Sequence, residues 1–353
     1  MNETTDFLIV GAGIIGLNLG ISLKERFPDS KITVIDKEGQ PAVHASGRNS
    51  GVLHAGFYYT SDSIKARFCR EGNQYLTNYC LEKKLPINQC GKLIVAENAN
   101  QLGVLDELLK RGKENNVELI ELDEQEAKKI EPRVRTFQRA LFSPSTSTLD
   151  PMQVMYSLVN DLGAAKIDLK QDTAFIEKKG KVIQTSKSKI EAGYLINAAG
   201  LYADQIAMKY GFAENYRILP FKGLYLYANP KQLNLKTNIY PVPDLNNPFL
   251  GVHFTVNVEG TTKIGPSAIP AFWREQYKGI DNFSIREMVE ILKRNASLFL
   301  LDHFDFRNLA LNEMKKYSKK KMVKAASAMI SNLSIASVGN WGKPGIRAQL
   351  IDL

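Results

Sequence analysis

Cysteine is scarce in this sequence, and its few cysteines are poorly spaced for metal or disulfide chemistry. Cys69, Cys80 and Cys90 are the only ones in 353 residues, and no two of them form a Cys-X-X-Cys pair. An odd number of widely spaced cysteines argues against a disulfide framework, and without a close pair a zinc cluster is not indicated. We therefore expect a protein of the reducing cytoplasm with no metal site.

A long uninterrupted hydrophobic run is also absent. The most apolar stretch, residues 7–23, follows Glu3 and Asp6 instead of lysine or arginine, and glycines interrupt it. These features argue against a membrane span and against a signal peptide. Repeats and low-complexity segments are missing as well, and a composition of 44% apolar and 24% charged residues is typical of a globular protein with a buried core.

Acidic residues are outnumbered, 37 against 46 lysines and arginines, which gives a net charge of +9. Much of the excess comes from one run: Lys315, Lys316, Lys319, Lys320, Lys321 and Lys324. Such a run is usually a solvated helix face, although it could also touch anionic lipid at the inner face of the membrane. No aromatic residues of a nucleic-acid-binding motif accompany it, so we expect no nucleic-acid partner.

The amino-terminal residues have the pattern of a βαβ unit. Residues 6–10 are a short apolar run that ends in glycines, and apolar residues then continue at helical spacing to Arg26. Residues 31–35 supply a second, β-branched strand that ends at Asp36. We therefore predict a strand, a helix and a second strand parallel to the first, with a right-handed crossover.

A Gly-X-Gly-X-X-Gly motif joins the first of these strands to the helix. The first glycine permits a tight turn, the second lets a pyrophosphate approach the backbone, and the third allows close packing. The phosphates would sit on free N–H groups at the start of the helix, and Asp36 could accept hydrogen bonds from ribose hydroxyls. The acid disfavours NADP. The residues expected to contact the dinucleotide here are Gly11, Gly13, Ile15, Gly16, Asp36 and Lys37.

The segment after the second strand favours FAD over NAD. Small residues and hydrogen-bond donors fill residues 44–51, which leaves room for a flat ring system. A later strand at 194–197 runs into Ala198-Ala199-Gly200 and a helix, which returns the chain to the nucleotide-binding layer. The additional residues expected to bind FAD are His44, Ser46, Gly47, Arg48, Asn49, Ser50 and Gly200.

Residues 223–227, 252–258 and 261–264 alternate between apolar and polar, as antiparallel strands with one buried face do. We therefore predict an α/β fold, with a Rossmann-like FAD-binding domain and an interleaved α+β substrate domain on a mixed or antiparallel sheet. The FAD-binding domain is expected to comprise residues 1–90, 145–215 and 325–353. The substrate-binding domain is expected to comprise residues 91–144 and 216–324.

The stretch from His44 to Tyr59, with its Ser-Gly-Arg-Asn-Ser-Gly core, resembles the signature of the L-2-hydroxyglutarate dehydrogenases. These enzymes belong to the D-amino-acid-oxidase-like (DAO) superfamily of FAD oxidoreductases. The resemblance continues through residues 197–200, 220–223, 241–243, 251–254 and 345–349, and so spans nearly the whole chain. It implies oxidation of (S)-2-hydroxyglutarate, a 2-hydroxy dicarboxylate, to 2-oxoglutarate by hydride transfer to flavin N5. The electrons would pass to a quinone or to oxygen.

Removing the hydroxyl proton requires a base, and histidine suits that task near neutral pH. His54 and His253 are the candidates, because His54 follows the flavin loop and His253 shares one strand face with Thr255 and Asn257. For the carboxylates, the resemblance points to Arg347, and Lys222 is a further candidate. Arg48 and Tyr58 are secondary candidates for the same role.

Other enzymes of the DAO superfamily are alternatives. Glycerol-3-phosphate dehydrogenase and the oxidisers of secondary amines share the architecture, so the substrate could be glycerol 3-phosphate or a secondary amine. The family normally continues beyond the Gly-Ile-Arg motif with a strand, a glycine-rich turn and a helix that cover the flavin. This sequence stops at Leu353, so we also consider a shortened pseudoenzyme with weakened FAD binding.

Overall fold

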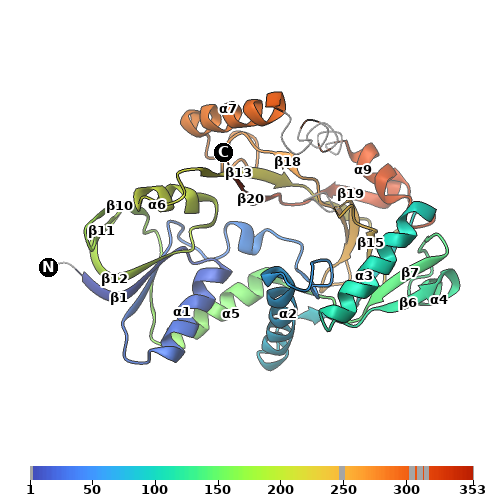
Figure 1. Ribbon diagram of the computed structural model, residues 1–353, viewed down its shortest axis with the longest axis horizontal. Coiled ribbons are helices and arrows are strands. Elements are labelled where there is room, and N and C mark those ends of the chain that lie inside the picture. The colour runs from blue at the N-terminus through green and yellow to red at the C-terminus, as the bar shows by residue number, and fades with distance from the viewer. Residues whose placement is uncertain (1–2, 246–250, 302–306, 308–312, 314–317, 353) are drawn as a thin grey trace.

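The computed structural model describes residues 3–245, 251–301, 307, 313 and 318–352. Two large β-sheets lie toward opposite ends of the molecule, one with six strands and one with eight (Figure 1). Two three-stranded sheets and several helices connect them. None of the helices in the described ranges combines the length and the hydropathy of a membrane span.

The six-stranded sheet contains the predicted βαβ unit. Its order is β10 (Phe175–Lys179), β11 (Val182–Thr185), β12 (Lys189–Asn197), β1 (Glu3–Val10), β2 (Ile32–Ile35) and β9 (Asp168–Lys170). β1 pairs in parallel with both β12 and β2, and β2 pairs in parallel with β9. The carboxyl ends of these strands therefore meet at one edge, where nucleotide sites form in such sheets.

Helices cover both faces of this sheet because its central strands are apolar on both sides. Ile9 and Val34 pack with α1 (Ile14–Arg26), α5 (Pro151–Ala164) and the end of α2 (Ile64–Glu82). Leu8 and Ile35 pack on the opposite face with Ile206 of α6 (Ala203–Lys209).

The eight-stranded sheet is mixed. Its order is β19 (Val338–Trp341), β14 (Leu226–Ala228), β17 (Thr262–Gly265), β16 (His253–Val256), β15 (Asn238–Pro241), β5 (Lys92–Val95), β7 (Arg139–Ser143) and β6 (Ile120–Asp123). Only the β15–β5 pair within it is parallel. This arrangement confirms the predicted fold class, a Rossmann-like unit interleaved with a mixed sheet.

The two faces of the eight-stranded sheet differ in chemistry. Leu93 and Phe254 lie on the face that packs against α4 (Glu124–Ile130) and α9 (Lys319–Ala326). Ile94 lies on the other face, beneath α3 (Leu102–Glu114). This second face also carries Lys92, Tyr240 and His253, because β-strand side chains alternate between faces.

The smaller sheets join the two halves. One consists of β18 (Ile269–Pro270), β13 (Tyr216–Gly223) and β20 (Gly345–Asp352), and α7 (Ile285–Leu301) packs on it. The other consists of β3 (Val52–Leu53), β8 (Ser147–Leu149) and β4 (Ile87–Asn88). Short 3-10 helices are η1 (Ala45–Gly47), η2 (Ala99–Gln101), η3 (Gly200–Tyr202) and η5 (Ile335–Ser337).

One local expectation differs from the structure. Residues 223–227 are not one strand, because β13 ends at Gly223 and β14 begins at Leu226 in another sheet. Residues 338–352 pair with strands of the 216–324 segment, β19 with β14 and β20 with β13. These pairings join residues more than a hundred positions apart, so local periodicity does not reveal them. The domain division stays a prediction.

Candidate active site

The glycine motif forms a tight turn between β1 and α1. Gly11 has φ +110°, and a Cβ there would lie 2.3 Å from the carbonyl oxygen of Ala198, so only glycine fits. A Cβ on Gly16 would lie 1.9 Å from the carbonyl oxygen of Gly11, which shows how closely the helix packs on the turn. At Gly13 a Cβ would meet only Ser46 Oγ, at 3.1 Å, so this glycine leaves room above the start of the helix.

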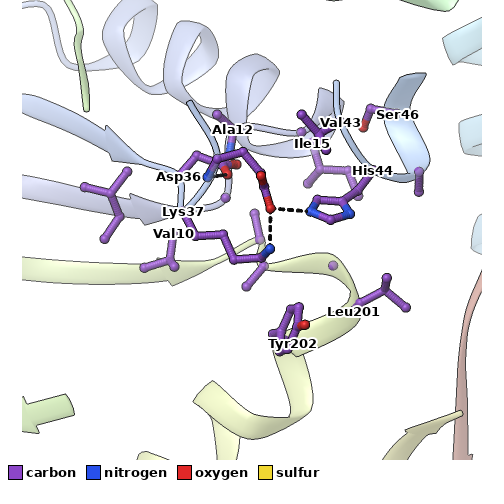
Figure 2. Close-up of a pocket in the computed structure, with 18 of the residues that line it drawn as sticks. Val10, Ala12, Ile15, Asp36, Lys37, Val43, His44, Ser46, Leu201 and Tyr202 are labelled. Atoms are coloured by element: carbon purple, nitrogen blue, oxygen red, sulfur yellow. Dashed lines mark hydrogen bonds and ion pairs between the residues drawn. The ribbon is translucent and has the colours of Figure 1, made fainter. Parts of the chain in front are cut away.

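Asp36, at the end of β2, is hydrogen-bonded to this turn. Its Oδ2 accepts a hydrogen bond from the Ala12 N–H at 2.7 Å, and its Oδ1 accepts one from the Glu38 N–H at 2.9 Å. Each carboxylate oxygen has a second lone pair, so both can still accept a hydrogen bond from a ribose hydroxyl. Asp36 is thus held in place by the backbone and pointed at the pocket (Figure 2).

A cavity of about 450 Å³ opens at this edge of the six-stranded sheet. Nine of the predicted cofactor residues line it: Gly11, Gly13, Ile15, Asp36, Lys37, His44, Ser46, Asn49 and Gly200. Ile15 is 65% exposed although its side chain is apolar, as expected where a ligand would cover it. Figure 2 shows His44 and Ser46 on one side of this cavity and Leu201 and Tyr202 on another.

The other four predicted cofactor residues, Gly16, Gly47, Arg48 and Ser50, do not line this cavity but shape the elements around it. A Cβ on Gly47 would lie 2.1 Å from the carbonyl oxygen of Ala42. Arg48 Nε donates to the Val43 carbonyl at 2.5 Å, and its guanidinium lies 4.2 Å from the centre of the Tyr277 ring. The Ser50 hydroxyl accepts the Val52 N–H at 3.3 Å. These contacts hold the loop of residues 42–52, which passes the start of α1, in place.

A charged network closes one side of the cavity. Lys37 Nζ pairs with Glu275 at 2.6 Å and also with Glu38. His44 joins it through Nε2, 2.9 Å from Glu38 Oε1, and through Nδ1, 2.8 Å from Tyr277 Oη. Burial lowers the pKa of Lys37, but hydrogen bonds and charge attraction with Glu275 and Glu38 outweigh it and raise that pKa overall. Lys37 therefore stays cationic beside the pocket.

Sequence reasoning missed Glu275 and Tyr277, which are far from the glycine motif along the chain. It also missed several residues of the cavity wall that belong to other elements: Thr173, Phe175, Tyr202, Gln205, Ile346 and Ala348. Two local signals touched part of this set: the Ala-Ala-Gly segment before Tyr202, which had predicted Gly200 alone, and residues 345–349, which contain Ile346 and Ala348. The glycine turn, the carboxylate and the open space above the helix start fit the pyrophosphate and ribose of an adenine dinucleotide.

The two predicted base candidates, His54 and His253, meet in a second cluster. It lies on the face of the eight-stranded sheet that carries Lys92 and Tyr240. The ring of His253 stacks on Tyr240 with centroids 3.8 Å apart, and His54 presents an edge-on contact to Tyr240 at 6.2 Å. The face that we predicted for His253 is confirmed, since Phe254 points into the opposite core. We name His54, Phe57, Tyr58, Lys92, Tyr240 and His253 the aromatic cluster.

The hydrogen bonds of the two histidines differ. His253 Nδ1 lies 2.8 Å from the Gly251 carbonyl, so in the neutral ring this nitrogen carries the proton. His54 Nδ1 is buried and has no hydrogen-bond partner. Burial, assisted by the charges of Lys92 and His253, lowers the pKa of His54 to about 3. His54 is therefore neutral at physiological pH and able to accept a proton.

Lys222 and Arg347 lie on adjacent strands but face different ways. In the β13–β20 register, Lys222 is opposite Ile346, which lines the cavity, whereas Arg347 is opposite Phe221. Directly opposite residues share a sheet face, so Lys222 lies on the cavity side. Arg347 interacts electrostatically with Tyr59, the neighbour of Tyr58 in the aromatic cluster. Burial lowers the pKa of both cations.

Comparisons with known proteins agree with this geometry. The FAD-dependent oxidoreductase (DAO) family model matches residues 6–306. The bovine mitochondrial L-2-hydroxyglutarate dehydrogenase is 37% identical over 366 residues, which cover 98% of this chain and 78% of the bovine one. The L-2-hydroxyglutarate dehydrogenase of Escherichia coli is 33% identical, with 98% of this chain and 82% of the relative covered.

Solved structures share the fold at lower identity. The L-α-glycerophosphate oxidase of Mycoplasma pneumoniae with FAD bound superposes with a TM-score of 0.75 at 22% identity, covering 98% of this chain and 83% of the other. The glycine oxidase of Geobacillus kaustophilus gives a TM-score of 0.71 at 16% identity, covering 99% and 84%. FAD is accordingly the cofactor of this chain. The chain belongs to the L-2-hydroxyglutarate dehydrogenase family of FAD-dependent oxidoreductases.

Proposed function

We propose that this enzyme oxidises (S)-2-hydroxyglutarate to 2-oxoglutarate. The names of its relatives support this substrate, and they support a hydroxy-acid oxidation in general. The structural observation that carries the proposal is the aromatic cluster, where His54 and His253 flank the Tyr240 ring and a lysine lies among them. A buried base beside cations suits an anionic substrate that must lose a proton.

His54 is the proposed base. Oxidation breaks the O–H and C2–H bonds of the substrate and forms a C2=O double bond. When bound, FAD would supply the electron acceptor for the hydride that leaves C2. The hydroxyl proton goes to a ring nitrogen of neutral His54, whose Nδ1 has no partner, while His253 keeps its Nδ1 proton on the Gly251 carbonyl. His253 then holds Tyr240 in place by stacking.

Arg347 is the proposed contact for the substrate carboxylate beside the reacting carbon. A guanidinium can bind a carboxylate through two parallel hydrogen bonds, which fixes orientation as well as position. Arg347 lies near Tyr59, next to the aromatic cluster, and its neighbour Ile346 lines the FAD cavity. Lys222 lies on the other face of the β13–β20 pair, with Ile346, and stays the alternative contact.

The electron acceptor that we infer is a quinone or oxygen. A quinone would require contact with the membrane surface, and α9 offers a basic face for it. Lys320, Lys321 and Lys324 are exposed, while Met322 and Ala326 of the same helix are buried. Lys315, Lys316 and His303 lie outside the described residues. Salt-sensitive sedimentation with anionic vesicles would support this contact, and a failure to sediment at low salt would contradict it.

Product identification tests the proposed reaction. The purified holoenzyme is incubated with an artificial electron acceptor and one substrate at a time: (S)-2-hydroxyglutarate, glycerol 3-phosphate or an N-methyl amino acid. We expect 2-oxoglutarate, identified by NMR, and no comparable turnover of the other two. Turnover of glycerol 3-phosphate or the amine alone would assign a related activity. No turnover of any substrate by the FAD-loaded protein would identify a pseudoenzyme.

A further inference from the structure

Lys92 is a buried cation that has no hydrogen-bond partner among the described residues. It is the first residue of β5, it is 0% exposed, and no described atom accepts a hydrogen bond from its Nζ. Three aromatic rings surround the ammonium group, with centroids 4.5 Å away for Phe57, 4.4 Å for Tyr58 and 5.0 Å for Tyr240. The ring faces stabilise a cation but accept no conventional hydrogen bond from it.

Burying an unpaired cation costs free energy of folding. Another buried cation of this chain, Arg274, is paired. Arg274, which is 2% exposed, forms two hydrogen bonds of 2.9 Å with the two carboxylate oxygens of Asp204. Lys92 has no such acid, and burial lowers its pKa to about 7. Beside it, Tyr58 Oη and His54 Nδ1 are also buried without hydrogen-bond partners. Three unpaired polar groups in one cluster indicate a place for a ligand.

We propose that the Lys92 ammonium group binds a carboxylate of the substrate, the one distant from the hydroxyl-bearing carbon of a 2-hydroxy dicarboxylate. This inference rests on the proposed function and adds the residue that selects dicarboxylates over monocarboxylates. The hydroxyl of Tyr58 is the second donor for the same carboxylate.

Strand register places Lys92 on the face where the reaction is proposed. Lys92 is opposite Asn238 in the parallel pair of β5 and β15, and Ile94 is opposite Tyr240, so Lys92 and Tyr240 share a face. His253 stacks on that same Tyr240 ring. The lysine and the stacking histidine therefore lie on one face of the sheet, and the proposed base contacts Tyr240 there.

A second cation lies near the same short segment. Arg347 interacts electrostatically with Tyr59, and Lys92 lies over the ring of Tyr58. Two cations beside consecutive residues match the two carboxylates of one substrate. A monocarboxylate would leave Lys92 without a counter-charge, and this gives the site a physical means of discrimination.

Binding of a carboxylate at Lys92 would also raise the proton affinity of His54, the proposed base. The charge of Lys92 contributes to the lowered pKa of His54. A carboxylate placed on Lys92 neutralises that charge and so raises the pKa of His54 toward its ordinary value. The base would then gain proton affinity only when the anionic substrate is present.

The test uses binding of glutarate, which lacks the hydroxyl group, and of butyrate to the FAD-loaded protein, measured by calorimetry. In Lys92→Met we expect the Kd for glutarate to rise by about 30-fold or more, as loss of a charged hydrogen bond predicts, with butyrate changed less than about threefold. The matched control is Lys263→Met: this half-buried lysine lies near Asp150 and Glu259 and should leave both affinities unchanged. Glutarate affinity equal to wild type in Lys92→Met overturns the proposal.

A second measurement avoids any variant. Calorimetry of the wild-type holoenzyme at pH 8, in two buffers of different ionisation enthalpy, counts the protons taken up on binding. Because Lys92 is largely neutral at that pH, we expect uptake of nearly one proton with glutarate and none with butyrate. No uptake with glutarate overturns the proposal. Glutarate binding without oxidation of (S)-2-hydroxyglutarate would instead count against the proposed function.

Discussion

The ring of His253 lies nearly parallel to the ring of Tyr240, with the centroids 3.8 Å apart and the planes inclined by 16°. His54 contacts the same tyrosine edge-on, at 6.2 Å and 85°. One aromatic ring thus separates two histidines that lie about two hundred residues apart in the sequence. The two histidines differ in their hydrogen bonds: among the described residues His54 Nδ1 has no partner, whereas His253 Nδ1 lies beside the Gly251 carbonyl.

Replacement of the proposed base should slow chemistry without releasing the cofactor. In His54→Gln we expect the rate constant of flavin reduction by (S)-2-hydroxyglutarate to fall by about 10²–10⁴-fold, the usual contribution of a general base. Anaerobic stopped-flow absorbance measures this rate constant. FAD content should stay stoichiometric, because His54 does not line the dinucleotide cavity. His253→Gln should cost less, and an equal or larger loss there would reverse the assignment.

The pH dependence of kcat/KM should have a single limb, on the alkaline side. Kcat/KM reports the free enzyme, in which His54 has a pKa of about 3 and stays neutral from pH 5 upward. Lys92 has a pKa of about 7 and loses the charge that attracts the substrate above that pH. The two tyrosines of the cluster, Tyr58 and Tyr240, have raised pKa values and stay neutral in this range.

We therefore expect kcat/KM for (S)-2-hydroxyglutarate to be flat between about pH 5 and pH 7 and to fall above it, by up to about tenfold per pH unit. In Lys92→Met the alkaline fall should disappear, along with much of kcat/KM. An acid limb near pH 6.5 in the wild type would show that a histidine with an ordinary pKa is the base.

A methyl group at the second glycine of the motif should interfere with the cofactor more than with the fold. A Cβ on Gly13 meets only Ser46 Oγ, at 3.1 Å, so Gly13→Ala should keep the apoprotein within about 1 kcal/mol of wild type. The same methyl occupies the space for the pyrophosphate, and we expect the Kd for FAD to rise at least about tenfold. Flavin fluorescence titration measures it.

The control for this variant is Gly163→Ala, at the end of α5, where a Cβ meets nothing within 4 Å. It should leave the FAD affinity unchanged. Equal FAD affinities for Gly13→Ala and wild type would contradict a pyrophosphate above the start of α1.

The buried ion pair between α6 and the segment after β18 should matter for stability. Arg274→Met leaves the buried Asp204 carboxylate without its guanidinium, and we expect the free energy of unfolding to fall by about 3–5 kcal/mol. Denaturant unfolding followed by circular dichroism measures the change. Arg139→Met removes exposed pairs with Asp106 and Glu121 and should cost about 1 kcal/mol or less. Similar losses in the two variants would contradict the role of burial.

Local patterns predicted the nucleotide-binding half well because its signals are contiguous in the sequence. The run before Gly11, the helix to Arg26 and the strand before Asp36 each follow from neighbouring residues, and the structure places them as expected. His54 and His253 stay predicted base candidates, chosen by their chemistry and by strand alternation. The contact of both histidines with Tyr240 was not predicted. It depends on the pairing of β15 with β16, and on the position of His54, just after β3, beside that sheet.

Lys92 escaped prediction for a related reason. In the sequence it is an ordinary lysine before an apolar run, and most lysines are solvated. Only the parallel pairing of β5 with β15, which brings Lys92 opposite Asn238, reveals that it is enclosed. The partners of His44 and Lys37 in the charged network, Tyr277 and Glu275, likewise come from a distant part of the chain.

The absorbance spectrum of the holoenzyme under anaerobic conditions, before and after addition of one equivalent of (S)-2-hydroxyglutarate, tests the proposed reaction most directly. We predict that the flavin band bleaches with the (S) enantiomer and persists with the (R) enantiomer, while one 2-oxoglutarate forms per FAD reduced. An FAD-loaded, folded protein whose spectrum does not change with either enantiomer would contradict the proposal.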